Sequence, residues 1–226
     1  MSLILDGPRL APAAGGRPDS LAVLLHGYGS NGADLLALAP YWAKLLPRTQ
    51  FLAPNAPQPV PMAPGGFQWF ALAQADPRLL DSGARAAAGP LDRFLDRELE
   101  RYGLDDARLA LIGFSQGTMM ALEVGLRRKT APAGIIGFSG ALVGRARLKP
   151  ERRCAPEVLL IHGDRDDRIP LPAMFDAADA LAEAGAGAQW HISYGVPHSI
   201  GPDGLELGGQ FLARVLAPKR ALQAKS

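Results

Sequence analysis

Short apolar runs alternate with longer helical patterns along this chain. Residues 21–26 (LAVLLH) and 108–114 (RLALIGF) are continuous apolar runs of the kind that forms buried strands. The same pattern predicts further strands at 50–53, 133–139, 158–162 and 189–194.

One stripe of apolar side chains marks a long amphipathic helix at residues 84–102. The stripe consists of Ala84, Ala88, Leu91, Leu95 and Leu99, with Phe94 beside them. Other helices are predicted at 35–46, which Pro47 closes, and at 118–128, 172–184 and 205–216.

Strands that alternate with helices predict a fold class. In the α/β class, a mostly parallel sheet is covered by helices on both faces. Functional groups of such sheets gather at the carboxyl ends of the strands. The segments that follow the predicted strands are therefore the places to search for chemistry.

Composition restricts the classes of function. The 226 residues suit one domain, and a hydrophobic fraction of 48% is enough for a sizeable core. The 24 basic and 22 acidic residues leave a net charge of +2. This near-balance argues against nucleic acid as a partner, because phosphate binding needs a concentrated positive field.

Cysteine content and hydropathy bear on the compartment. The one cysteine, Cys154, cannot form an internal disulfide and suits a reducing compartment. No apolar run approaches the roughly 18 residues of a membrane span, and residues 1–10 lack the pattern of a signal peptide. We expect a cytoplasmic protein without stable membrane insertion, either a monomer or a dimer.

A G-x-S-x-G motif, GFSQG at residues 113–117, follows the predicted strand at 108–114 and precedes a predicted helix. A serine on so sharp a turn has strained backbone angles, and side chains two positions before and after it would collide unless both are glycine. The N–H groups at the start of the helix also face this serine. The context favours Ser115 as a nucleophile over an ordinary turn serine.

Four histidines compete for the role of general base, which a serine nucleophile requires. His191 lies on the polar face of a predicted strand, and His26 and His162 end apolar strands, where we expect them to shape turns by hydrogen bonding. His198 follows the last predicted strand, as the chain order Ser…Asp…His requires. We therefore predict His198 as the base.

Three aspartates compete for the carboxylate that orients the histidine. Asp164, Asp166 and Asp167 all follow the strand at 158–162, at the required edge of the sheet. Asp164 could brace the loop by local hydrogen bonds, and Asp167 could pair with a neighbouring arginine at the surface. The spacing does not choose among the three.

Two backbone N–H groups are expected to form an oxyanion hole. One belongs to Gln116, the residue after the nucleophile, and the other lies in the loop after an earlier strand. That loop is the glycine-rich segment 26–32, in which we assign the Tyr28 N–H. The loop lacks the third glycine and the acidic partner of a dinucleotide site, and also the lysine of a P-loop.

The segment 54–72 is apolar for a loop. Its apolar side chains either pack as a satellite core or line a slot for an acyl chain. We predict the slot, lined by Met62, Trp69 and Phe70.

The densest basic run comprises Arg145, Arg147, Lys149, Arg152 and Arg153. We interpret it as a solvated connection between two strands. The alternative is a surface that docks on anionic lipid heads or acidic proteins.

With these residues in place, the chain resembles the carboxylesterase and acyl-protein thioesterase family, also called phospholipase/carboxylesterase. The resemblance extends over most of the chain and rests on LLHGYG at 24–29, PNAP at 54–57, WF at 69–70, GFSQG at 113–117, HGDRD at 162–166, IP at 169–170, and YG at 194–195 before His198. Thr118 departs from the family, which has a third small glycine there, and Tyr28 stands where leucine is frequent.

The resemblance implies a single-domain α/β-hydrolase fold without a separate cap domain, and no metal or cofactor. In the family's HGDxD pattern the catalytic aspartate is the second one, which is Asp166 here. The activity implied is hydrolysis of small carboxylic esters by Ser115, Asp166 and His198.

Three functions remain open from the sequence. The first is a carboxylic-ester hydrolase for short-to-medium acyl chains. An acyl-protein thioesterase or lysophospholipase would pass through the same acyl-serine intermediate. A non-catalytic binding protein of the hydrolase fold is the third, although a pure binder has no need of a complete triad.

Overall fold

The structure, a computed structural model, describes residues 4–72 and 76–217. Its main sheet has seven strands: β1 Arg9–Leu10, β2 Ser20–Leu25, β3 Thr49–Leu52, β6 Leu109–Phe114, β7 Gly134–Phe138, β8 Glu157–Gly163 and β9 Ala188–Ser193. Their spatial order is β1-β3-β2-β6-β7-β8-β9, and only β1 runs antiparallel to its neighbour in this sheet. A small hairpin, β4 Gln58–Pro59 and β5 Phe67–Gln68, lies apart from it.

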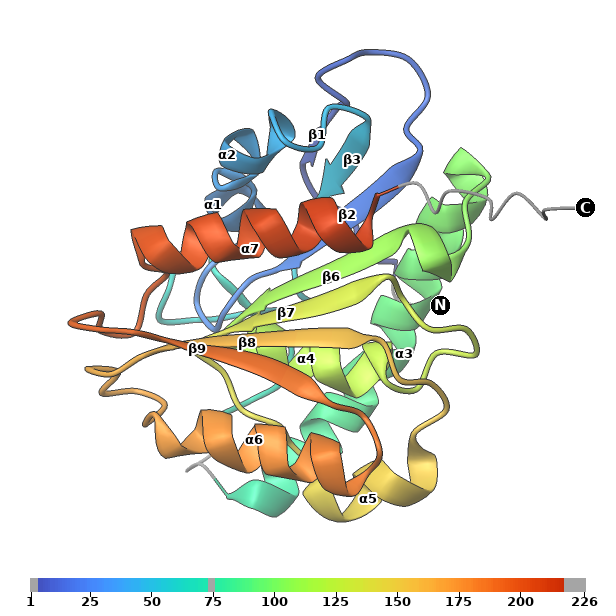
Figure 1. The fold of residues 1–226 in the computed structure, drawn as a ribbon. Helices are drawn as coiled ribbons and strands as arrows, with labels where there is room; N and C mark the ends of the chain where they lie inside the picture. Colours follow the sequence, from blue (N-terminus) through green and yellow to red (C-terminus); the bar gives the residue numbers. More distant parts are fainter. Residues whose placement is uncertain (1–3, 73–75, 218–226) are drawn as a thin grey trace, which may run out of the picture.

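Helices cover both faces of the sheet (Figure 1). The helices of the structure are α1 Gly32–Leu36, α2 Ala39–Ala43, α3 Pro77–Tyr102, α4 Gln116–Gly125, α5 Arg145–Glu151, α6 Pro172–Glu183 and α7 Pro202–Val215. α1, α2 and α7 pack on one face, and α3 to α6 pack on the other. The described chain is thus a single-domain α/β fold with no separate cap domain, which confirms the predicted class.

Strand register aligns the carboxyl ends of the central strands. Leu25 of β2 pairs with Gly113 of β6, and Phe114 pairs with Phe138 of β7. Both β2 and β6 are almost wholly buried, because parallel strands have helices on each side. The segments after β2, β6, β8 and β9 consequently meet at one edge, at the left in Figure 1.

The prediction of one helix at 35–46 is wrong. Two short helices, α1 and α2, replace it. Pro40 lies at the second position of α2, where its missing N–H costs nothing. Continuing α1 through this position would lose a hydrogen bond and press the proline ring on the carbonyl group of Leu36, so α1 ends at Leu36.

Two other helices differ from their predicted bounds. α3 begins at Pro77, two turns before the predicted start, and the Asp76 side chain caps it by accepting from the Arg78 N–H. α4 begins directly after Ser115 and ends at Gly125 rather than at residue 128. Arg128 instead forms ion pairs with three aspartates, Asp92, Asp96 and Asp106.

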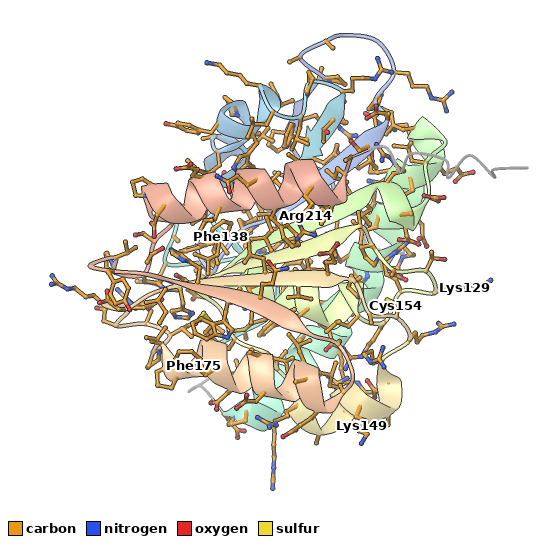
Figure 2. All side chains as sticks on the ribbon, in the orientation of Figure 1. Lys129, Phe138, Lys149, Cys154, Phe175 and Arg214 are labelled. Atoms are coloured by element: carbon orange, nitrogen blue, oxygen red, sulfur yellow. The ribbon has the colours of Figure 1, made fainter. Side chains whose placement is uncertain are left out.

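The basic run at 145–153 is not the solvated connection that the sequence predicts, because its first part forms α5. The Arg147 guanidinium is largely buried and ion-pairs with Asp81, Glu123 and Glu151. Lys149 is exposed on the same helix (Figure 2). The three carboxylates therefore offset the positive charge of the Arg147 guanidinium.

Candidate active site

Ser115 occupies the turn between β6 and α4 in a strained backbone conformation. Its φ of 54° lies in a region that non-glycine residues rarely adopt. Backbone atoms crowd Gly113 and Gly117 so closely that a Cβ atom at either position would overlap them. The Ser115 N–H donates to the carbonyl oxygen of Phe138 at 2.9 Å, which ties the turn to β7.

Thr118 holds the same turn from behind. Its hydroxyl lies 2.9 Å from the carbonyl oxygens of both Gly113 and Phe138 and donates toward them. This side chain is buried and braces the ends of β6 and β7. The extra methyl and hydroxyl, compared with glycine, thus fill space under the turn.

His198 lies between Ser115 and Asp166. Its Nε2 atom is 3.0 Å from the Ser115 Oγ, and its Nδ1 atom is 2.8 Å from the Asp166 Oδ2. The loop between β9 and α7 supplies this histidine, and the Phe114 ring packs against its imidazole at 4.9 Å between ring centres. Three side chains from distant parts of the chain therefore form a continuous hydrogen-bonded series.

The Asp166 carboxylate is buried and fully engaged. Its Oδ1 atom accepts from the N–H groups of Arg168 and Ile169, both at 2.9 Å, and its Oδ2 atom also lies 3.3 Å from the His162 Nε2. Burial raises the pKa of this carboxyl, but the hydrogen bonds with His198, Ile169 and Arg168 outweigh it and lower the pKa overall. Asp166 is thus ionised near neutral pH.

The other two aspartates of this loop, Asp164 and Asp167, have partners other than His198. The Asp164 carboxylate accepts from the Gly195 N–H at 2.6 Å and ties its own loop to the one that carries His198. Asp167 is exposed, and its Oδ1 lies 4.0 Å from the Arg168 Nε. Of the three candidates, only Asp166 contacts His198 in the described structure.

The remaining histidines have other partners. The His26 and His162 rings contact backbone groups at strand ends, the turn-shaping contacts that the sequence predicts. His191 pairs with Asp203 at 2.7 Å, so it links β9 to the first turn of α7.

Two backbone N–H groups are available beside Ser115. Both Tyr28 and Gln116 line the cavity that contains Ser115, and neither N–H donates a hydrogen bond within residues 4–72 and 76–217. Gln116 begins α4, where the first N–H groups of a helix have no partner inside it. Backbone N–H groups without a partner are the kind of donor that stabilises a developing negative oxygen.

The cavity at this edge has a volume of about 810 Å³. Its apolar lining comes from Leu72, Leu80, Met119, Ala141, Ile169, Pro170 and Pro197. Asp167 and Arg168 supply opposite charges at its border. A mostly apolar cavity with a few convergent polar groups is typical of a small-molecule site.

Within the described ranges, no three His, Cys, Asp or Glu side chains converge as metal ligands. None of the helices seen there is long and apolar enough to cross a bilayer.

The profile of the phospholipase/carboxylesterase family matches residues 12–216. The chain belongs to this family. Among solved structures, esterase PE8 is 43% identical, with a TM-score of 0.90, over 94% of this chain and 100% of that chain.

Curated relatives extend the comparison. Acyl-protein thioesterase 1 of Gibberella zeae is 27% identical over 94% of this chain and 97% of the relative. Esterase YpfH of Escherichia coli strain K12 is 29% identical over 80% of this chain and 76% of the relative. These relatives carry the names of esterases and thioesterases, and this phospholipase/carboxylesterase family member is a hydrolase of the α/β-hydrolase fold.

The residues predicted to line an acyl slot do not line the cavity of this hydrolase. Met62 is 91% exposed and lies outside the cavity lining. Trp69 and Phe70 are buried in the core, so they correspond to the satellite-core alternative for the loop 54–72. The structure does not bring these three residues to the cavity that contains Ser115.

Trp69 and Phe70 instead connect the turn at Ser115 to the glycine-rich loop at residues 26–32. The Gln116 side chain accepts from the Trp69 N–H at 2.9 Å and donates to the Phe70 carbonyl oxygen at 2.7 Å. The Trp69 indole N–H donates to the His26 carbonyl oxygen at 3.0 Å. The aromatic pair therefore supports the loop that carries Tyr28.

Sequence reasoning missed the actual cavity wall of this hydrolase. Leu80 lies on the first turns of α3, which the sequence pattern did not predict, and Met119 lies one turn after Ser115 on α4. The rule that sites gather at the carboxyl ends of strands indicated the region of Ala141 and Ile169. That rule does not specify which side chains face the cavity.

Proposed function

We propose that the protein is a serine carboxylic-ester hydrolase that acts on small esters with short-to-medium acyl chains. The observation that carries the proposal is the position of His198, within 3.0 Å of the Ser115 Oγ and 2.8 Å of the Asp166 Oδ2. We assign these three residues as nucleophile, base and orienting carboxylate.

The proposed reaction begins with proton transfer. The Asp166 carboxylate accepts from Nδ1–H of His198, which leaves Nε2 free to take the proton from Ser115. The Ser115 Oγ then attacks the ester carbonyl carbon, and the carbonyl oxygen becomes an oxyanion between the Tyr28 and Gln116 N–H groups.

Collapse of this tetrahedral intermediate breaks the bond to the alcohol oxygen. The alcohol leaves with the proton that His198 holds, and the acyl group stays on the Ser115 Oγ as an ester. His198 next removes a proton from water, and the resulting attack forms a second tetrahedral intermediate. Its collapse returns the proton to Ser115 and releases the acid.

The cavity supports an apolar acyl group. Leu80, Met119, Ala141 and Ile169 line it without a charged group of their own. The two charged residues at the border, Asp167 and Arg168, carry opposite charges and so create little net field. This favours uncharged esters.

Acyl-protein thioesterase activity is the second candidate, because relatives such as the protein of Gibberella zeae carry that name. A series of p-nitrophenyl esters from acetate to palmitate, run beside the matching acyl thioesters, separates the two. Highest kcat/KM for the shorter esters supports the proposal. Highest kcat/KM for long-chain thioesters would replace it with the thioesterase function, and no turnover of either series would reject both.

A further inference from the structure

The His26 ring has a defined tautomer, because its two nitrogen atoms have different partners. The Ala56 N–H donates to Nε2 at 2.9 Å, so Nε2 presents a lone pair and carries no hydrogen. The hydrogen of the neutral ring is then on Nδ1, which donates to the Gly27 carbonyl oxygen at 2.8 Å. The ring is fully buried.

The Gly27 carbonyl group shares a peptide unit with the Tyr28 N–H. In a planar trans peptide the C=O and N–H bonds point in opposite directions. Fixing the carbonyl oxygen therefore also fixes the direction of the N–H. The Ser30 N–H reaches the same oxygen at 3.3 Å, a longer contact than that of His26.

The ring itself is held in place. The Phe67 and Trp69 rings pack against the His26 ring, with centroid distances of 6.5 Å and 5.7 Å. The Trp69 indole N–H also binds the His26 carbonyl oxygen, and Gln116 binds the backbone of Trp69. The two residues that offer N–H groups to the cavity, Gln116 and Tyr28, are thereby linked.

Burial supports the neutral form of this histidine. It lowers the pKa of the His26 imidazole, and the opposing effect of the hydrogen bond to Gly27 is smaller. A neutral ring keeps Nε2 as the acceptor for the Ala56 N–H. Both contacts of the ring are thus maintained together near neutral pH.

We propose that His26 is a positioning residue, which aims the Tyr28 N–H at the oxyanion by holding the Gly27 carbonyl oxygen with Nδ1–H. The inference rests on the proposed function, since an oxyanion forms only if Ser115 attacks an ester. It assigns to His26 a part in transition-state stabilisation without contact to substrate.

Two amide substitutions separate the nitrogen atoms of the ring. His26→Asn places an N–H near the position of Nδ1, whereas His26→Gln reaches the position of Nε2 and lacks the nearer donor. We expect His26→Gln to lower kcat at least about tenfold with KM changed less than about threefold, since removal of one whole oxyanion donor costs about 10²–10³ in kcat. His26→Asn should retain most of the wild-type kcat.

A transition-state analogue gives the readout that a purely structural role would not move. A trifluoromethyl ketone forms a hemiketal oxyanion with Ser115, so its Ki should rise in His26→Gln by the same factor as kcat/KM falls. The control is Leu99→Ala, which removes a buried side chain near the C-terminal end of α3, outside the cavity lining. It should lower thermal stability and leave Ki unchanged.

Failure of this inference differs from failure of the proposed function. Wild-type enzyme that turns over esters, with equal kcat in the Asn and Gln variants, would overturn the role of His26 alone. Wild-type enzyme without any turnover would reject the function itself. Should neither variant fold, ¹⁵N NMR of histidine-labelled wild-type protein decides: a neutral ring with hydrogen on Nδ1 supports the proposal, and hydrogen on Nε2 overturns it.

Discussion

The Nδ1 atom of His198 lies 2.8 Å from the Oδ2 atom of Asp166, on a carboxylate whose other oxygen is held by two backbone N–H groups. These bonds leave Asp166 little freedom to rotate. The contact therefore sets both the orientation and the tautomer of the imidazole.

Asp166→Asn should lower kcat for p-nitrophenyl esters by roughly four orders of magnitude at neutral pH, because an amide no longer stabilises the charged imidazole or selects its tautomer. Asp167→Asn is the matched control, since Asp167 is exposed and its carboxylate lies beside Arg168, whereas the carboxylate on His198 is that of Asp166. It should change kcat less than about threefold. The reverse ranking of the two variants would show that the wrong aspartate has been assigned.

Backbone packing around Ser115 leads to a second prediction. The Leu25 carbonyl oxygen lies so close to Gly117 that a Cβ atom has no room there. Gly117→Ala should lower the free energy of unfolding by at least about 3 kcal/mol, measured by urea denaturation. Gly187→Ala, where a Cβ atom meets nothing within 4 Å, should stay within about 1 kcal/mol of wild type. Equal stability of the two variants would contradict the described turn.

The ion pairs of Arg147 on α5 predict that removing this side chain lowers the stability of the protein but not its kcat. Arg147→Ala would leave the buried Glu123 carboxylate with one fewer partner and should cost about 3 kcal/mol in the free energy of unfolding. Lys149→Ala, exposed on the same helix, should cost less than about 0.5 kcal/mol. The kcat of both folded variants should match wild type, and a selective loss of kcat in Arg147→Ala would contradict this structural role.

The same ion pairs predict a pH dependence. The hydrogen bond from Arg147 lowers the pKa of the Asp81 carboxyl below its ordinary value, and this outweighs the opposing effect of burial. In acid, the Asp81 carboxyl therefore binds a proton more readily in the unfolded chain than in the folded one. The stability that Asp81 contributes is present above about pH 4 and is lost as the pH falls through the pKa of Asp81 in the folded protein. The stability difference between wild type and Arg147→Ala should shrink below about pH 4 in urea titrations. A difference that grows on acidification would have the wrong sign.

Sequence patterns predicted much of the fold because buried strands and amphipathic helices have distinct periods. The runs that became β2, β6 and β8 were found within one or two residues of their observed bounds. The pattern failed where a local rule was overridden. Pro40 divided a predicted helix, and α5 was hidden because Arg147 is a charged residue that neighbouring acids allow to be buried.

The candidate site was predictable in part. The G-x-S-x-G motif predicted Ser115, and the chain order of the three residues predicted His198. Spacing alone could not separate Asp166 from the neighbouring aspartates. The cavity wall was not predictable, because the direction of a side chain depends on tertiary packing. Trp69 shows this, since its ring lies in the core and its indole N–H supports a loop.

Mass spectrometry of the acyl-enzyme tests the central claim most directly. Wild-type protein mixed with p-nitrophenyl butyrate and quenched in acid should carry one butyryl group, located on Ser115 by peptide mapping, and Ser115→Ala should carry none and show no turnover above background. Butyryl label on any other residue, or undiminished turnover by Ser115→Ala, would contradict the assignment of Ser115 as nucleophile.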